Sequence, residues 1–226
     1  MKIYGLQKTT LLDYPGKLAC TVFLGGCNFN CPYCHNHEIA RRTVEPLYDD
    51  SYVLSFLKKR RSTLEGVCIS GGEPTLQGDK LLSFISKAKD LGLKVKLDTN
   101  GYLPDVIETV ISDGLADYIA MDIKNSIDKY PDTIGLESFN KYRIAESIDI
   151  LTEGKVDYEF RTTVAKEFHA PEDIEDIGML IYGAERIYLQ PYVGTGFTAP
   201  TVDELSEYAS ILGDYVDYVG IRGVSI

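Results

Sequence analysis

The chain has 226 residues, of which 44% are hydrophobic, and 34 acidic against 23 basic residues give it a formal net charge of −11. This length is enough for one sizeable core, and no low-complexity linker divides it, so we expect a single domain over residues 1–226. The acidic balance argues against a nucleic-acid partner, because phosphate binding depends on clustered Lys and Arg. No apolar run approaches the roughly 20 residues of a membrane span, and the start lacks a signal-peptide core, so we expect a cytoplasmic protein without a membrane partner.

Short apolar runs typical of β-strands recur along the chain. They cover residues 18–24, 66–70, 94–99, 117–122, 157–164, 186–190 and 216–221. Helical patterns lie between them: residues 78–91 carry an apolar stripe that stops at Gly92, and Pro104 opens a second helix that ends before Gly114. Later helices run up to Gly154 and Gly183, and the last begins at Thr201, where Glu204 completes a capping box. The basic run 58–61 is typical of the solvated C-terminal end of a helix.

Strands and helices that alternate about every thirty residues indicate repeated βαβ units and therefore a parallel sheet. Six such units make an incomplete (βα)6 parallel barrel, here with a short N-terminal extension and a C-terminal strand. In parallel barrels, active sites collect at the carboxyl ends of the strands. Polar motifs follow these strand ends in turn: the cysteine loop 27–34, the Gly-Gly-Glu-Pro turn 71–74, and the segments 98–101, 122–124 and 190–192, with Arg161 on the fifth strand.

Three cysteines, Cys27, Cys31 and Cys34, stand within eight residues after the first of these strands. The CxxxCxxC spacing lets three thiolates converge on one polynuclear centre, and a cube of four irons and four sulfides ordinarily takes four thiolates. One iron would thus be open to an outside ligand. The remaining cysteines, Cys20 and Cys68, lie within apolar runs and are expected in the core.

Two other interpretations of the cysteines exist. His35 or His37 could complete a Cys₃His zinc site, although structural zinc ligands usually come as two separated pairs. A disulfide framework is disfavoured by the odd number of cysteines and by a length that needs no covalent staple.

The cysteine triplet with an aromatic residue before its last member, followed by Gly71-Gly72-Glu73-Pro74 after the next strand, resembles the radical S-adenosylmethionine (SAM) enzymes. The resemblance implies a [4Fe-4S] cluster on the three cysteines and SAM as cofactor. Within that superfamily, the stretch 11–17 (Leu-Leu-Asp-Tyr-Pro-Gly-Lys) and the Cys-His-Asn run 34–36 resemble the activating proteins of anaerobic ribonucleoside-triphosphate reductase.

The same resemblance implies roles for residues around the cluster. Gly71, Gly72 and Glu73 would meet the methionyl ammonium, since glycines permit close backbone approach and a carboxylate suits a cation. Tyr33 would lie beside the adenine. The methionyl carboxylate and the ribose would be bound by polar residues at the ends of the third to fifth strands, matched here by Asp98, Asp122, Lys124 and Arg161.

The charged residues at these strand ends also have an alternative interpretation, because charges inside a barrel are costly unless they are paired. They could form a structural ion-pair network. Asp98 and Asp122 could also share a small cation.

The activity implied by the resemblance is reductive cleavage of SAM to generate a glycyl radical on a partner enzyme, expected to be anaerobic ribonucleotide reductase, with a flavodoxin or ferredoxin as electron donor. The cluster and SAM carry this chemistry, so no further catalytic residue is expected. Two alternatives stay open: a radical SAM enzyme that acts on a small molecule or peptide, and a noncatalytic iron–sulfur or zinc module.

Overall fold

The computed structural model describes residues 1–224. One nine-stranded sheet runs through the molecule in the order β3-β1-β2-β4-β5-β6-β7-β8-β9. The strands are β1 (Lys2–Thr10), β2 (Ala19–Leu24), β3 (Tyr48–Asp49), β4 (Gly66–Gly71), β5 (Lys94–Thr99), β6 (Tyr118–Asp122), β7 (Asp157–Val164), β8 (Ile187–Pro191) and β9 (Val219–Ile221).

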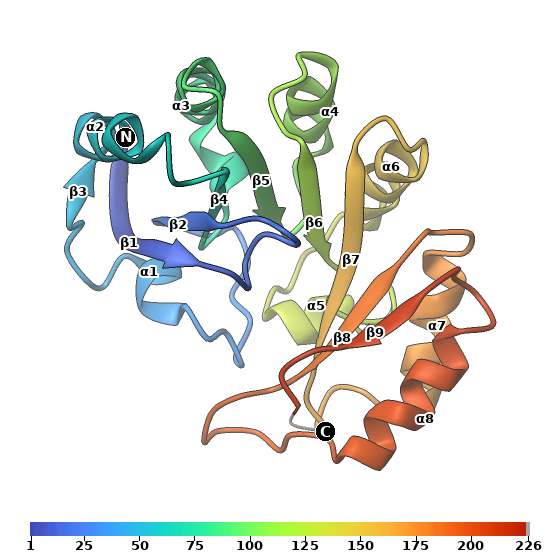
Figure 1. Cartoon of the computed structure of the whole chain (residues 1–226). Coiled ribbons are helices and arrows are strands. Elements are labelled where there is room, and N and C mark those ends of the chain that lie inside the picture. The colour runs from blue at the N-terminus through green and yellow to red at the C-terminus, as the bar shows by residue number, and fades with distance from the viewer. Residues whose placement is uncertain (225–226) are drawn as a thin grey trace.

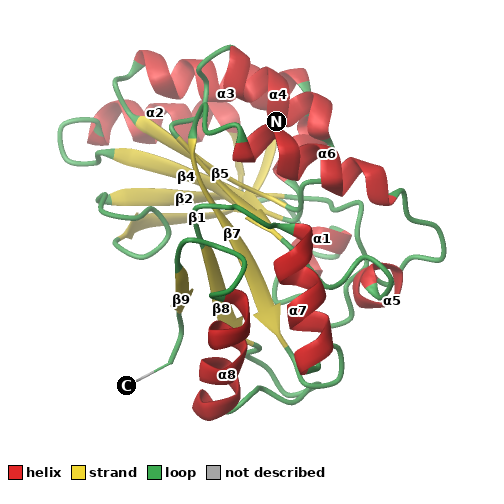
Figure 2. Cartoon of the chain, turned by 90° about the vertical axis from the view of Figure 1, so that its right-hand side faces the viewer, coloured by secondary structure: helices red, strands yellow, loops and turns green. Residues whose placement is uncertain are grey.

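The strands from β2 to β9, apart from β3, pair in parallel, whereas β1 pairs antiparallel with both β2 and β3. The helices are α1 (His37–Arg41), α2 (Asp50–Arg60), α3 (Asp79–Asp90), α4 (Pro104–Ser112), α5 (Tyr130–Ile134), α6 (Lys141–Thr152), α7 (Pro171–Leu180) and α8 (Val202–Leu212), with a 3₁₀ turn at Pro74–Gln77. Figures 1 and 2 show the longer helices around the outside of a sheet that curves without closing. The predicted incomplete (βα)6 barrel is therefore confirmed.

The expected strands and helices are present, with small differences at their ends. The strand expected at 66–70 extends to Gly71, and the last strand is shorter than expected. The N-terminal extension is itself a strand, and the long connection 125–139 contains α5. Among the described residues, no helix is long and apolar enough to cross a membrane.

The apolar core lies between the sheet and the outer helices, and it leaves the other side of the sheet for polar groups. On β5, Val95 and Leu97 belong to this core, while Lys96 and Asp98 alternate with them and face the barrel interior. The interior also holds a small cluster that includes Tyr14 and Tyr118. Alternation along each strand thus brings charged side chains into the barrel, directly below its carboxyl rim.

Candidate active site

A cavity of about 570 Å³ lies at the carboxyl ends of the parallel strands. Ten of the eleven residues predicted for the site line it, and Glu73 is the exception. The cysteine loop contributes to its lining, and so do the segments that follow β8 and β9, through Tyr192 and Arg222. The strand-end motifs therefore converge on one site, as the barrel topology predicts.

The cysteine loop is fastened to its surroundings by backbone hydrogen bonds. Before Cys27, the Gly26 N–H donates to the Ile39 carbonyl (3.0 Å), and the Gly26 carbonyl accepts from the Glu73 N–H (2.7 Å). Further along, the Asn30 N–H donates to the Ile134 carbonyl of α5 (2.8 Å). These contacts fix the loop over the barrel mouth.

The Gly-Gly-Glu turn after β4 packs directly against the residues that precede the cysteine loop. Gly71 has φ +128°, and a Cβ there would lie 2.2 Å from the Leu24 carbonyl oxygen. A Cβ on Gly72 would lie 2.1 Å from the Gly26 carbonyl oxygen. Only glycine fits this close to Leu24 and Gly26, and both glycines also line the cavity. The Asn36 side chain donates to the Gly71 carbonyl (3.2 Å).

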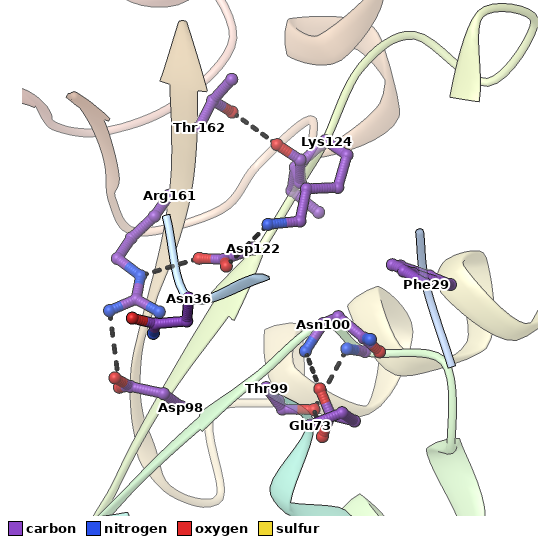
Figure 3. A network of polar contacts seen from close by, with 12 residues as sticks. Phe29, Asn36, Glu73, Asp98, Thr99, Asn100, Asp122, Lys124, Arg161 and Thr162 are labelled. Carbon is purple, nitrogen blue, oxygen red and sulfur yellow. Dashed lines mark hydrogen bonds and ion pairs between the residues drawn. The ribbon is translucent and has the colours of Figure 1, made fainter. Parts of the chain in front are cut away.

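Glu73 is fully buried, and its carboxylate points into the wall of the cavity (Figure 3). It accepts hydrogen bonds from the Thr75 N–H (3.0 Å), the Thr99 hydroxyl (2.9 Å) and the Asn100 N–H (2.6 Å). Burial raises the pKa of this carboxyl, which the hydrogen bonds counteract. Glu73 therefore ties the turn after β4 to the end of β5.

A network of ion pairs crosses the cavity wall from β5 to β7 (Figure 3). The Arg161 guanidinium contacts both Asp122 (Nε to Oδ1, 2.9 Å) and Asp98 (Nη1 to Oδ1, 3.4 Å). Lys124 pairs with Asp122 (2.9 Å), and Lys96 pairs with Asp98. Burial alone would raise the pKa of Asp98, but Arg161 and Lys96 hold it at about 2.

The network brings together the four charged residues predicted to bind the methionyl carboxylate and the ribose. They form the ion-pair network of the alternative interpretation and also line the cavity, and their role in cofactor binding stays a prediction. Arg161 contacts Asp98 and Asp122 together, so the position considered for a shared small cation is held by a guanidinium.

Comparisons with known proteins agree with this arrangement. The family model of the radical SAM superfamily matches residues 21–178. A protein of Methanocaldococcus jannaschii, provisionally named as a glycyl-radical enzyme activating enzyme, is 35% identical over 241 aligned residues, which cover 99% of this chain and 96% of the relative. The 7-carboxy-7-deazaguanine synthase of Thermococcus kodakarensis is 28% identical over 78% of this chain and 75% of that protein. The chain belongs to the radical SAM superfamily.

Solved structures show the same fold at lower sequence identity. Streptococcus suis SuiB bound to S-adenosylmethionine superposes with a TM-score of 0.68 at 16% identity, over 90% of this chain and 52% of SuiB. Within the superfamily, the near-full-length match to the M. jannaschii relative groups this radical SAM enzyme with the glycyl-radical activating enzymes, which confirms the predicted resemblance at the level of that class.

The donor set fits the [4Fe-4S] cluster of a radical SAM enzyme. Burial raises the pKa of the Cys27 thiol to about 11 and also raises that of Cys31, so cluster binding must displace protons from these thiols. Among the described residues, no three His, Cys, Asp or Glu side chains gather closely enough for a single metal ion. In a [4Fe-4S] cluster each thiolate binds a different iron, so the ligands need not meet at one point. Three cysteines that line one cavity suit that arrangement. Cys20 and Cys68 are buried in the barrel wall, away from the cavity, as predicted.

Tyr33 lines the cavity between two of the cysteines, and only 6% of it is exposed. Its ring packs against Phe168, with the centroids 5.2 Å apart. Within the described part of the chain, its buried hydroxyl has no hydrogen-bond partner. An orphan buried hydroxyl at a cavity is the kind of group that a bound ligand satisfies.

Sequence reasoning gave no role to several residues of the site. Asn100 was expected at the rim as part of the strand-end segment 98–101, and it lines the cavity and contacts Cys27. Arg222 follows β9 and reaches back into the barrel, where it binds the fully buried Glu159 through two hydrogen bonds of 2.7 Å. Nothing in the sequence marks that pair. His35 and His37 are both exposed, and of the two only His35 lines the cavity.

Proposed function

We propose that this radical SAM enzyme activates a glycyl-radical enzyme by removing a hydrogen atom from a backbone glycine, and that its partner is the anaerobic ribonucleotide reductase. The observation that carries the proposal is the cysteine set: of the five cysteines in the chain, three line the cavity and two lie elsewhere in the core. A cluster held by three thiolates keeps one iron free for the cofactor. The near-full-length match to a relative named as an activating enzyme supports the choice of substrate class.

Cys27, Cys31 and Cys34 would hold the cluster. With SAM, the cluster supplies the electron and the carbon-centred radical that takes the hydrogen atom. Tyr33 offers an aromatic face and an orphan hydroxyl to the adenosyl part of the cofactor.

The cavity wall presents both kinds of polar group that an amino acid moiety needs. Gly71 and Gly72 bring bare backbone to the cavity, where carbonyl oxygens suit an ammonium group. In the ion-pair network, the three cations Lys96, Lys124 and Arg161 outnumber the two carboxylates, which leaves a positive excess for a carboxylate ligand. Glu73 contributes by holding the glycine turn in place.

The rim of the cavity beyond β8 and β9 suits a substrate that is itself a protein loop. Gln190 and Pro191 at the end of β8, Tyr192 after it and Arg222 after β9 line this part of the cavity. An extended glycine-containing segment can lie along such a rim with its main chain toward the cofactor. A flavodoxin or ferredoxin would deliver the electron, and the cytoplasm is the compartment that we propose.

A second candidate is supported by the relative that is a 7-carboxy-7-deazaguanine synthase and covers three quarters of the chain. On this alternative the enzyme would act on a small molecule. The same cavity would then hold the substrate as well as the cofactor.

The deciding experiment combines the reconstituted enzyme, dithionite and SAM with purified anaerobic ribonucleotide reductase in the absence of oxygen. We expect the electron paramagnetic resonance doublet of a glycyl radical, with release of methionine and 5′-deoxyadenosine. A reductase variant in which the target glycine is alanine is the control and should give no doublet. Release of both products without a doublet would favour the small-molecule candidate, and release of neither would favour a noncatalytic module.

A further inference from the structure

The three cysteines of the site have different hydrogen-bonding environments. The Cys27 Sγ accepts from the Phe29 N–H (3.4 Å) and from the Asn100 Nδ2 (3.8 Å). Among the hydrogen bonds of the described residues, none is donated to the Sγ of Cys31 or Cys34. Cys27 is therefore the one sulfur of the set that already has N–H donors directed at it.

The orientation of the Asn100 amide follows from its neighbours. Its Oδ1 accepts from the Tyr102 N–H (3.0 Å), and a backbone N–H can only donate. The Nδ2 must therefore point the other way, toward Cys27 and toward the Asn28 Oδ1, to which it donates at 2.8 Å. Hydrogen-bonding partners, and not an arbitrary choice of rotamer, direct this donor at the sulfur.

Asn100 is also held firmly in place. Only 5% of it is exposed, and its backbone N–H donates to the fully buried Glu73 carboxylate at 2.6 Å (Figure 3). Thr99 donates to the same carboxylate, so the end of β5 is fixed at two consecutive residues. A donor on such a support keeps its distance to Cys27 when a ligand enters the cavity.

An independent observation indicates that acceptors belong near this donor group. The Nδ2 of Asn28, the residue directly after Cys27, is buried and has no partner in the described structure. Its Oδ1 is already taken by Asn100, which fixes the orphan N–H₂ on the opposite side of the amide. A buried donor without an acceptor is costly, so an acceptor is expected beside this amide, which directly follows Cys27 although Asn28 itself does not line the cavity.

We propose that Asn100 is a positioning residue that donates an N–H···S hydrogen bond to the Cys27 thiolate of the cluster and raises its reduction potential. Hydrogen bonds to cluster sulfurs offset negative charge, and the reduced cluster carries one more negative charge than the oxidised one. The bond therefore stabilises the reduced state after the electron arrives from the donor, and no proton is transferred. The inference rests on the cluster of the proposed function, but not on the identity of the partner enzyme.

The test is a redox titration of the reconstituted cluster, followed by electron paramagnetic resonance, without SAM and without partner enzyme. Asn100→Asp keeps the shape of the side chain, removes the donor and adds a negative charge. At the midpoint potential of the wild type, we expect the ratio of reduced to oxidised cluster to fall at least about tenfold, which corresponds to a 59 mV lower midpoint for one electron. Asn100→Ala removes the donor without adding charge and should lower the ratio in the same direction, by about threefold.

Asn140→Asp is the matched control, because it adds the same charge at the exposed N-cap of α6, outside the cavity lining. We expect its midpoint to equal that of the wild type. An unchanged midpoint in Asn100→Ala with a full complement of iron and sulfide would overturn the proposal. Loss of the cluster from both Asn100 variants would also overturn it, since Asn100 would then act in assembly. A wild type that assembles no cluster would instead contradict the proposed function.

Discussion

Replacement of Gly72 by alanine tests the close approach between the turn after β4 and the cysteine loop. The new Cβ would lie 2.1 Å from the Gly26 carbonyl oxygen, so the two backbones must separate by about 1 Å to reach an ordinary contact. That movement breaks the hydrogen bond from the Glu73 N–H to the Gly26 carbonyl, now 2.7 Å. Overpacking of about 2 kcal/mol and a lost hydrogen bond of about 1 kcal/mol together lower the free energy of unfolding by about 3 kcal/mol.

Gly92→Ala is the matched control. Gly92 has φ +82°, and no atom lies within 4 Å of the position that an alanine Cβ would take, so alanine there suffers only backbone strain of about 1 kcal/mol. In thermal unfolding of the cluster-free protein, followed by circular dichroism, we expect Tm to fall by about 6–12 °C for Gly72→Ala and about 2–4 °C for Gly92→Ala. Gly72→Ala should also take up less iron on reconstitution. Equal falls in Tm for the two variants would refute the steric reasoning.

Three further predictions follow from charges and ligands. The pKa of Asp98 is held at about 2, below the ordinary 3.8, so its ion pairs stabilise the fold above about pH 4 and this contribution is lost as the pH falls toward 2. Urea unfolding should show a steeper loss of stability over this range in the wild type than in Asp98→Asn, and parallel curves would contradict the assignment. Arg222→Ala leaves the fully buried Glu159 without its cation, so the free energy of unfolding measured by chemical denaturation should fall by about 3 kcal/mol. Adding Glu159→Gln to this variant should recover much of that loss. A loss below about 0.5 kcal/mol in Arg222→Ala would refute the pairing. Cys31→Ala should abolish binding of iron and sulfide in metal analysis while Tm stays within a few degrees, and retained SAM cleavage would exclude Cys31 as a ligand.

Much of the fold could be predicted because its signals are local. The parallel strands are short buried runs, and glycine or proline marks most helix ends, as at Gly92 and Pro104. The antiparallel strand β1, which lies between β3 and β2, was missed because its buried and exposed positions do not alternate cleanly. Of helix α2, only the C-terminal end was predicted, from the basic run 58–61, because only Val53 and Leu57 are buried on this helix and its apolar stripe is weak.

For the site too, features that depend on local sequence signals could be predicted, and features that depend on long-range contacts could not. Placement on successive parallel strands, toward the rim, was enough to predict that Asp98, Asp122 and Arg161 meet. The direction of the Glu73 side chain could not be predicted, because it depends on the backbone of the preceding glycine turn. Asn100 contacts a cysteine 73 residues earlier, and such a contact is known only once the strand register is known.

The central claim is that three cysteines hold a [4Fe-4S] cluster with one iron open to SAM, and the most direct measurement is the electron paramagnetic resonance spectrum of the reduced, reconstituted protein before and after SAM is added. We predict the signal of a reduced [4Fe-4S] cluster whose shape changes when SAM binds. A full cluster whose signal is indifferent to SAM, or a protein that holds zinc in place of iron, would contradict the account.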